Sequence, residues 1–127
     1  MARGGPPGWP RDLPPRGTAE FDERVVGWLL DRAPADLRGS ILRQFPIALG
    51  RVVAHVVAGE LDGIRNAYST ARGELGEYLA ADELATVQSA LEAEGARLLA
   101  VQREVALVEE ALAVGARPPR ITPRIKR

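Results

Sequence analysis

Residues 84–112 read LATVQSALEAEGARLLAVQREVALVEEAL, and apolar side chains recur in this stretch every three or four positions. That spacing is typical of a helix that buries one continuous stripe against a second helix. The stripe consists of Leu84, Val87, Leu91, Glu94, Leu98, Val101, Val105, Val108 and Leu112. With Asp82 as the N-cap, and with Gly115 and two prolines after its end, the pattern predicts a helix over residues 83–114.

A second stripe with the same spacing precedes the first one and predicts a helix over residues 47–80. It consists of Ile47, Gly50, Ala54, Val57, Leu61, Ile64, Tyr68, Ala71, Leu75 and Tyr78. If the chain folds back near residue 81, opposite positions have numbers that sum to 162, and each pair joins an a position to a d position, as in antiparallel coiled coils. In this register Tyr68 lies opposite Glu94, and we expect these two side chains to form a structural polar pair that fixes the alignment.

Two shorter apolar patterns come before the hairpin. Thr18 is a suitable N-cap for a helix that carries Phe21, Val25 and Trp28 on one face. Pro34 ends this helix and begins a second short one, which Pro46 ends. We therefore expect an all-α fold: a long antiparallel, coiled-coil-like helical hairpin with two short N-terminal helices packed on one end. Residues 62–95 would protrude as two helices alone.

The domain limits follow from composition. Residues 1–18 are rich in proline and glycine and predict a disordered or extended arm, residues 19–115 form the helical domain, and residues 116–127 form a basic tail that contains proline. Trp9 and Leu13 are the large apolar residues of the arm. They either bind a partner or pack on the surface of the protein itself.

Charge is unevenly distributed, although the formal net charge is zero. Residues 20–115 contain nine Arg and 16 acids, whereas residues 116–127 contain five bases and no acid. The bases of the tail are Arg117, Arg120, Arg124, Lys126 and Arg127. Two alternatives are open: the tail binds phosphates of a nucleic acid, which predicts strong salt dependence, or it binds an acidic protein surface. Ile121 and Ile125, which alternate with these charges, favour binding to protein.

Small residues mark one face of the first long helix. Gly59, Gly63 and Gly73 lie there with Asn66 and Thr70. Interior glycines cost a helix about 1 kcal/mol each relative to alanine, so such a face is either tolerated on an exposed surface or used for close approach of a partner. We list these glycines with Trp9, Leu13 and the tail bases as partner-binding candidates.

The sequence contains no recognisable catalytic, cofactor-binding or metal-binding motif. It has no cysteine and a single histidine, His55, which we expect to face the short helices in a structural role. A di-iron carboxylate site lacks its Glu-x-x-His ligands, and no phosphate-binding glycine loop is present. The longest apolar run, VVAHVVAG at residues 52–59, is shorter than the ~20 residues of a membrane span. We therefore expect no enzyme activity and no cofactor, and a cytoplasmic location without membrane contact.

The two stripes, the segment LRQFP (residues 42–46) and the segment EGARLLAVQREVALVEEAL (residues 94–112) resemble small uncharacterised helical proteins of actinobacterial type. This resemblance covers residues 9–115 and implies no activity or site.

Three functions are compatible with these patterns. The first is a non-enzymatic helical interaction or adaptor module, a homodimer that also binds another protein. The second is a nucleic-acid-associated accessory protein that acts through the basic tail. The third is an enzyme or small-molecule carrier that uses the apolar end of the bundle.

Overall fold

The computed structural model describes residues 5–116, and that range contains helices but no strand. Its elements are α1 (Ala19–Leu30), the 3₁₀ turns η1 (Ala35–Gly39) and η2 (Ile41–Gln44), α2 (Pro46–Leu75) and α3 (Ala81–Ala116). The all-α prediction is confirmed. Within the described range no helix is long and apolar enough to cross a lipid bilayer.

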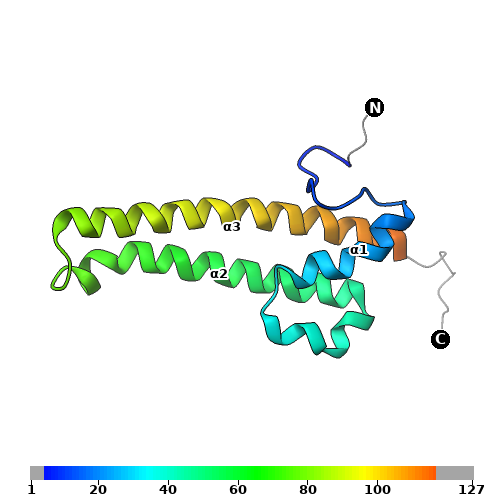
Figure 1. Ribbon diagram of the computed structural model, residues 1–127, viewed down its shortest axis with the longest axis horizontal. Helices are drawn as coiled ribbons and strands as arrows, with labels where there is room; N and C mark the ends of the chain where they lie inside the picture. Colours follow the sequence, from blue (N-terminus) through cyan, green and yellow to red (C-terminus); the bar gives the residue numbers. More distant parts are fainter. Residues whose placement is uncertain (1–4, 117–127) are drawn as a thin grey trace, which may run out of the picture.

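Helices α2 and α3 run antiparallel along the long axis of the molecule, joined by a short turn (Figure 1). Several of their buried residues, among them Val57 and Val105, belong to the two sequence stripes, whereas Val53 is buried outside them. Burial is uneven along the pair. Between residues 62 and 97 only Ala71 and Leu84 are buried, whereas most of the core lies at the other end, which we call the base.

Two predicted helix ends are wrong. Helix α2 ends at Leu75 rather than at residue 80, with Gly76 as its C-cap, so that Tyr78 lies in the turn and is 78% exposed. Asp82 is not the N-cap of α3. The helix begins at Ala81, and the side chain of Glu83 accepts a 2.8 Å hydrogen bond from the backbone N–H of Ala80. A glutamate at the third position of a helix takes this role in capping boxes.

The base is completed by α1 and by the arm, which pack on the ends of α2 and α3 (Figure 1). Thr18 caps α1 as predicted, because its Oγ1 accepts a 3.1 Å hydrogen bond from the N–H of Phe21. One core cluster joins the arm to the three helices. Its members are Leu13, Phe21, Val25, Trp28, Leu29, Leu30, Leu49, Val53, Val57, Val105, Val108 and Ala111.

The expected second short helix is two 3₁₀ turns instead. Ser40 adopts an extended conformation between them, and its side chain accepts a hydrogen bond from the N–H of Leu42. Hydroxyl side chains that bond to nearby backbone groups compete with helix formation, which explains the break. As a result the segment buries little: Ile41 is 62% exposed and Phe45 is 55% exposed. The base is therefore covered less completely than a four-helix end would be.

Candidate interaction groove

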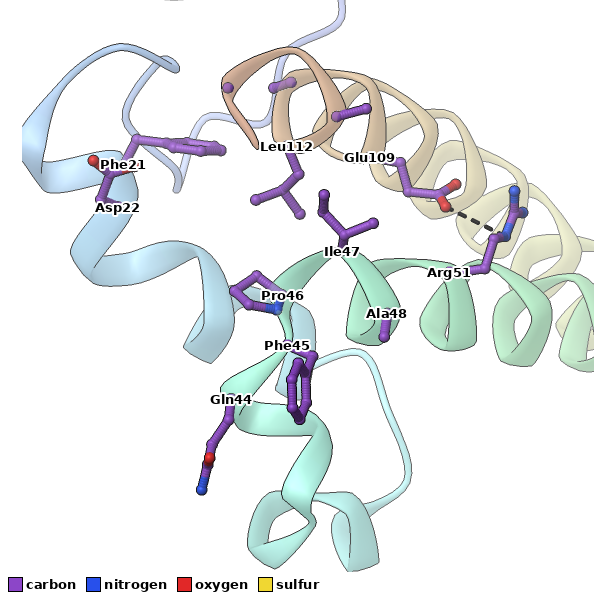
Figure 2. A pocket seen from close by; sticks show the side chains of 13 residues that line it. Phe21, Asp22, Gln44, Phe45, Pro46, Ile47, Ala48, Arg51, Glu109 and Leu112 are labelled. Atoms are coloured by element: carbon purple, nitrogen blue, oxygen red, sulfur yellow. Dashed lines mark ion pairs between the residues drawn. The ribbon is translucent and has the colours of Figure 1, made fainter. Parts of the chain in front are cut away.

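An open apolar groove of about 810 Å³ lies at the base, between α1 and the facing ends of α2 and α3. Helix α1 contributes Phe21 and Asp22, and the start of α2 contributes Pro46 and Ile47. The wall from α3 consists of Glu109, Ala111, Leu112, Ala113 and Gly115. Gln44, Phe45, Ala48 and Arg51 complete the lining. Figure 2 shows the side chains of Ile47 and Leu112 pointing toward each other, with the Phe45 ring below them, where the chain passes from η2 into α2.

The groove exposes large apolar side chains. Phe45 is 55% exposed and Ile47 is 48% exposed, whereas Leu112 and Phe21 connect the floor of the groove to the core cluster. Fully burying an aromatic or branched side chain of this size gains about 1.5–3 kcal/mol. Contiguous exposed apolar surface of this kind marks binding grooves in soluble proteins.

Polar groups are few and lie at the edges of the groove. Arg51 and Glu109 form an ion pair at 3.4 Å across the hairpin, drawn as a dashed line in Figure 2. No described side chain caps the first turn of α2, whose N-cap residue is Phe45. Backbone N–H groups in the first turn of a helix lack intrahelical acceptors, so a segment bound here would find donors for its carbonyl oxygens.

A second polar cluster joins the arm to α1 and to the turn that follows α1. Asp12 Oδ1 accepts a 2.8 Å hydrogen bond from Trp28 Nε1, and Asp12 Oδ2 accepts one of 3.0 Å from the guanidinium of Arg32. That guanidinium lies 3.7 Å from the centroid of the Trp28 ring and also donates to the Trp28 carbonyl. The three side chains form a latch between the arm and α1.

The latch affects two carboxyl groups. Burial alone would raise the pKa of Asp12, but the hydrogen bonds from Trp28 and Arg32, with the Arg32 charge, lower it below its ordinary value. Glu104 on α3 shows the opposite: burial raises its pKa, the Arg32 charge opposes this, and the Asp12 charge adds to it. Burial and the side chains of the latch cause both shifts, and neither group lines the groove.

The predicted polar pair of Tyr68 and Glu94 is wrong. Glu94 instead accepts two hydrogen bonds from Arg97 on its own helix, at 2.9 and 2.6 Å, which lower the pKa of Glu94 below its usual value. Tyr68 is 38% exposed and lies in a surface hollow beside Glu92 and Leu99, on the other side of α3. A neighbouring guanidinium on the same helix satisfies the carboxylate, so no phenol is needed across the hairpin.

The remaining candidates are scattered. Gly59, Gly63 and Gly73 are exposed, and a Cβ placed at any of them would meet no atom within 4 Å. Arg117, Arg120, Arg124, Lys126 and Arg127 lie outside the described residues.

The arm residues proposed for partner binding pack on the protein itself. Leu13 is 3% exposed within the core cluster, and the Trp9 ring lies 5.9 Å from that of Phe21. Trp9 Nε1 also donates a 2.8 Å hydrogen bond to the Leu13 carbonyl. Of the two alternatives for the arm, the structure shows self-packing.

His55 does not face the short helices as expected, since it lies on the exposed side of α2. Across residues 5–116 no three His, Asp or Glu side chains are grouped closely enough to hold a metal ion.

Sequence reasoning missed the groove and the latch. Asp12 is the only acid in the first 19 residues, which is a usable signal for a local partner. The groove has no such signal, because it results from the 3₁₀ turns that leave Phe45 and Ile47 uncovered.

Comparisons of the chain with protein-family models, with curated proteins and with solved structures found no match.

Proposed function

We propose that this protein is a non-enzymatic helical interaction module that forms a homodimer and binds a segment of a partner protein in the groove at its base. The observation that carries the proposal is the exposure of Phe45 and Ile47 in an apolar groove of about 810 Å³. The expected partner segment presents two or three apolar side chains, because the groove walls offer few polar groups. The Trp9 and Leu13 arm is not part of this binding surface.

The uneven burial of the hairpin supports the homodimer. In its outer half only Ala71 and Leu84 are buried, so two helices there gain little from apolar contact. The α2 face that carries Gly59, Gly63 and Gly73 has no bulky side chains at these positions and would admit a second copy at close range. A second copy on this half of the hairpin would provide the missing cover.

The dimer is tested by light scattering coupled to size exclusion. Gly63→Arg places a long charged side chain on the outer face of α2, and we expect it to convert the dimer to a monomer. Gly27→Arg is the matched control, because Gly27 is also an exposed helical glycine with open space around it. A wild-type chain that is monomeric at all accessible concentrations would refute the dimer.

The groove is tested by comparing the proteins retained by tagged variants in a lysate of the native organism. Ile47→Glu puts a charge into the groove, at a helix N-terminus where an acid does not harm folding. Ile41→Glu changes an exposed isoleucine outside the groove and serves as the control. We expect one set of proteins to be retained by the wild type and by Ile41→Glu but lost with Ile47→Glu. Equal retention by all three would refute the groove as a binding surface.

A second candidate function is nucleic-acid binding through the tail, for which the five bases in residues 116–127 are the supporting observation. Fluorescence anisotropy with labelled RNA and DNA tests it. Binding that weakens steeply with salt and is lost when the tail bases are replaced by glutamine would favour this alternative. The cytoplasmic location stays a prediction.

A further inference from the structure

The arm is held on the helices by one guanidinium that has a donor to spare. Arg32 uses two of its nitrogen atoms, donating to Asp12 Oδ2 at 3.0 Å and to the Trp28 carbonyl at 2.8 Å. Its third nitrogen, Nε, is buried and finds no hydrogen-bond partner among the described residues. A buried donor without a partner is unfavourable, so the guanidinium is stabilised if a second acceptor comes within reach.

A second carboxylate lies near the same guanidinium. Glu104 on α3 is only partly exposed, and burial raises its pKa while the Arg32 charge lowers it and the Asp12 charge raises it. No hydrogen bond is among the causes of that shift. Asp12, Arg32 and Glu104 thus meet where the arm, the turn after α1 and α3 come together, and the two acids compete for one base.

Few other charged groups act on this cluster. From α1, Arg24 donates a long hydrogen bond of 3.5 Å to the backbone carbonyl of Asp12 rather than to its carboxylate. The shift of Asp12 arises from burial, from hydrogen bonds of Trp28, Arg32 and its own backbone, and from the Arg32 charge. No titratable group on α2 contributes to the shift of either carboxyl. Because Arg32 stays protonated, the charge state of the cluster depends on Asp12 and Glu104.

We propose that Arg32 exchanges between two carboxylates, Asp12 when the arm is closed on α1 and Glu104 when the arm is loosened, so that the ionisation of Glu104 regulates how tightly residues 5–18 are held. When Glu104 is protonated, Arg32 pairs with Asp12 and the arm is closed. When Glu104 is ionised, it attracts Arg32 and repels Asp12, and both effects weaken the hold on the arm. The arm is therefore held most tightly in mild acid, above the lowered pKa of Asp12 and below the raised pKa of Glu104.

Loosening of the arm changes the apolar surface of the base. The Trp9 ring lies 5.9 Å from that of Phe21, which also lines the groove, and Leu13 belongs to the core cluster. A loosened arm uncovers the side of Phe21 that faces Trp9 and so extends the apolar surface around the groove. The exchange of Arg32 does not rest on the proposed function, because it needs neither a second copy nor a partner segment.

The indole of Trp28 reports the state of the arm, because its Nε1–H donates to Asp12 Oδ1 and is protected only while the arm is closed. The test follows hydrogen exchange of this group by NMR in the full-length protein. At neutral pH we expect Glu104→Gln to slow the exchange about three- to fivefold, a modest factor because partly exposed ion pairs contribute little free energy. In mild acid, where Glu104 is protonated, the variant and the wild type should exchange equally. Glu92→Gln is the matched control, since Glu92 is an exposed acid of α3 that lies beside Tyr68 instead, and it should leave the exchange unchanged.

Two comparisons separate the exchange of Arg32 from a general gain in stability. The backbone N–H of Val57, a buried residue of α2, reports global opening, and Glu104→Gln should slow its exchange less than that of the Trp28 indole. In an Asp12→Asn background the arm offers Arg32 no carboxylate, so Glu104→Gln should lose most of its effect on the indole. Equal factors for Trp28 and Val57, additive effects of the two substitutions, or no slowing by Glu104→Gln at neutral pH would overturn the proposal.

Discussion

Replacing Leu13 by alanine tests whether the arm is part of the core. The Leu13 side chain is 3% exposed in the core cluster, so the variant loses the transfer free energy of its buried methyl groups and also leaves a cavity. Leu→Ala changes at such sites cost about 2–5 kcal/mol, and we expect about 3 kcal/mol here. The 2.8 Å hydrogen bond from Trp9 Nε1 goes to the backbone carbonyl of Leu13, so the substitution spares it. The measured loss is therefore almost purely apolar.

The assay is equilibrium unfolding in urea, followed by far-ultraviolet circular dichroism, with Ile41→Ala as the control. Ile41 is 62% exposed, and its truncation should cost less than about 0.5 kcal/mol. For a domain of this size a loss of about 3 kcal/mol also lowers the Tm by about 12 °C. If Leu13→Ala costs no more than the control, the arm is not part of the core.

Four further substitutions test single contacts by the same unfolding assay. Thr18→Ala removes the cap of α1 and should cost about 1 kcal/mol, and an unchanged free energy of unfolding would contradict the cap. Asp12→Asn keeps an acceptor for the indole but removes the charge beside Arg32, which should cost about 0.5–1 kcal/mol at neutral pH. Because the pKa of Asp12 is lowered in the folded state, this stabilisation is present above the ordinary pKa of 3.8 and disappears as the pH falls through the folded-state pKa. If the variant and the wild type still differ in free energy of unfolding below that pH, the result would argue against the ion pair. Glu104→Gln should stabilise the protein at neutral pH. Because the pKa of Glu104 is raised in the folded state, the stability of the wild type falls as the pH rises from the ordinary pKa of 4.5 through the folded-state pKa. The stabilisation by Glu104→Gln should therefore vanish in acid. A variant that is less stable than the wild type at neutral pH would refute the burial argument. Within one chain Gly63→Ala meets no neighbouring atom and would stabilise α2 by about 0.5–1 kcal/mol, whereas close packing of a second copy on this face, as proposed, predicts a loss; a gain would argue against the dimer.

The spacing of apolar residues predicted the helices well because burial and periodicity are coupled along a long amphipathic helix. Val57, Leu61, Leu98 and Val105 were assigned to the stripes, and all four are buried. Predicted helix ends were less accurate. Helix α2 ends at Leu75, with Gly76 as its C-cap, at a point that apolar spacing does not mark, and Tyr78 leaves the stripe as a result.

Tertiary contacts decided the features that sequence reasoning left open or assigned wrongly. Whether Leu13 meets solvent or the core depends on how the arm crosses α1, and Asp12 determines this through partners 16 and 20 residues away. Tyr68 across the hairpin was predicted as the partner of Glu94, but the structure pairs Glu94 with Arg97, three residues along the same helix. The local pair forms because residues three apart on a helix are neighbours in any tertiary arrangement.

The position of the core also constrains how the protein is made. The arm and α1, synthesised first, pack against the last turns of α3, synthesised nearly last. At about 5–20 residues per second, Trp28 and Leu29 remain without their final neighbours for several seconds after they are joined to the chain. During that interval α2 and the growing α3 can pair from the turn at residues 76–80 toward the base, because those contacts are the closest in sequence. Docking of the first 30 residues then completes the fold, so an interrupted chain that lacks the end of α3 would expose most of the residues that form the core.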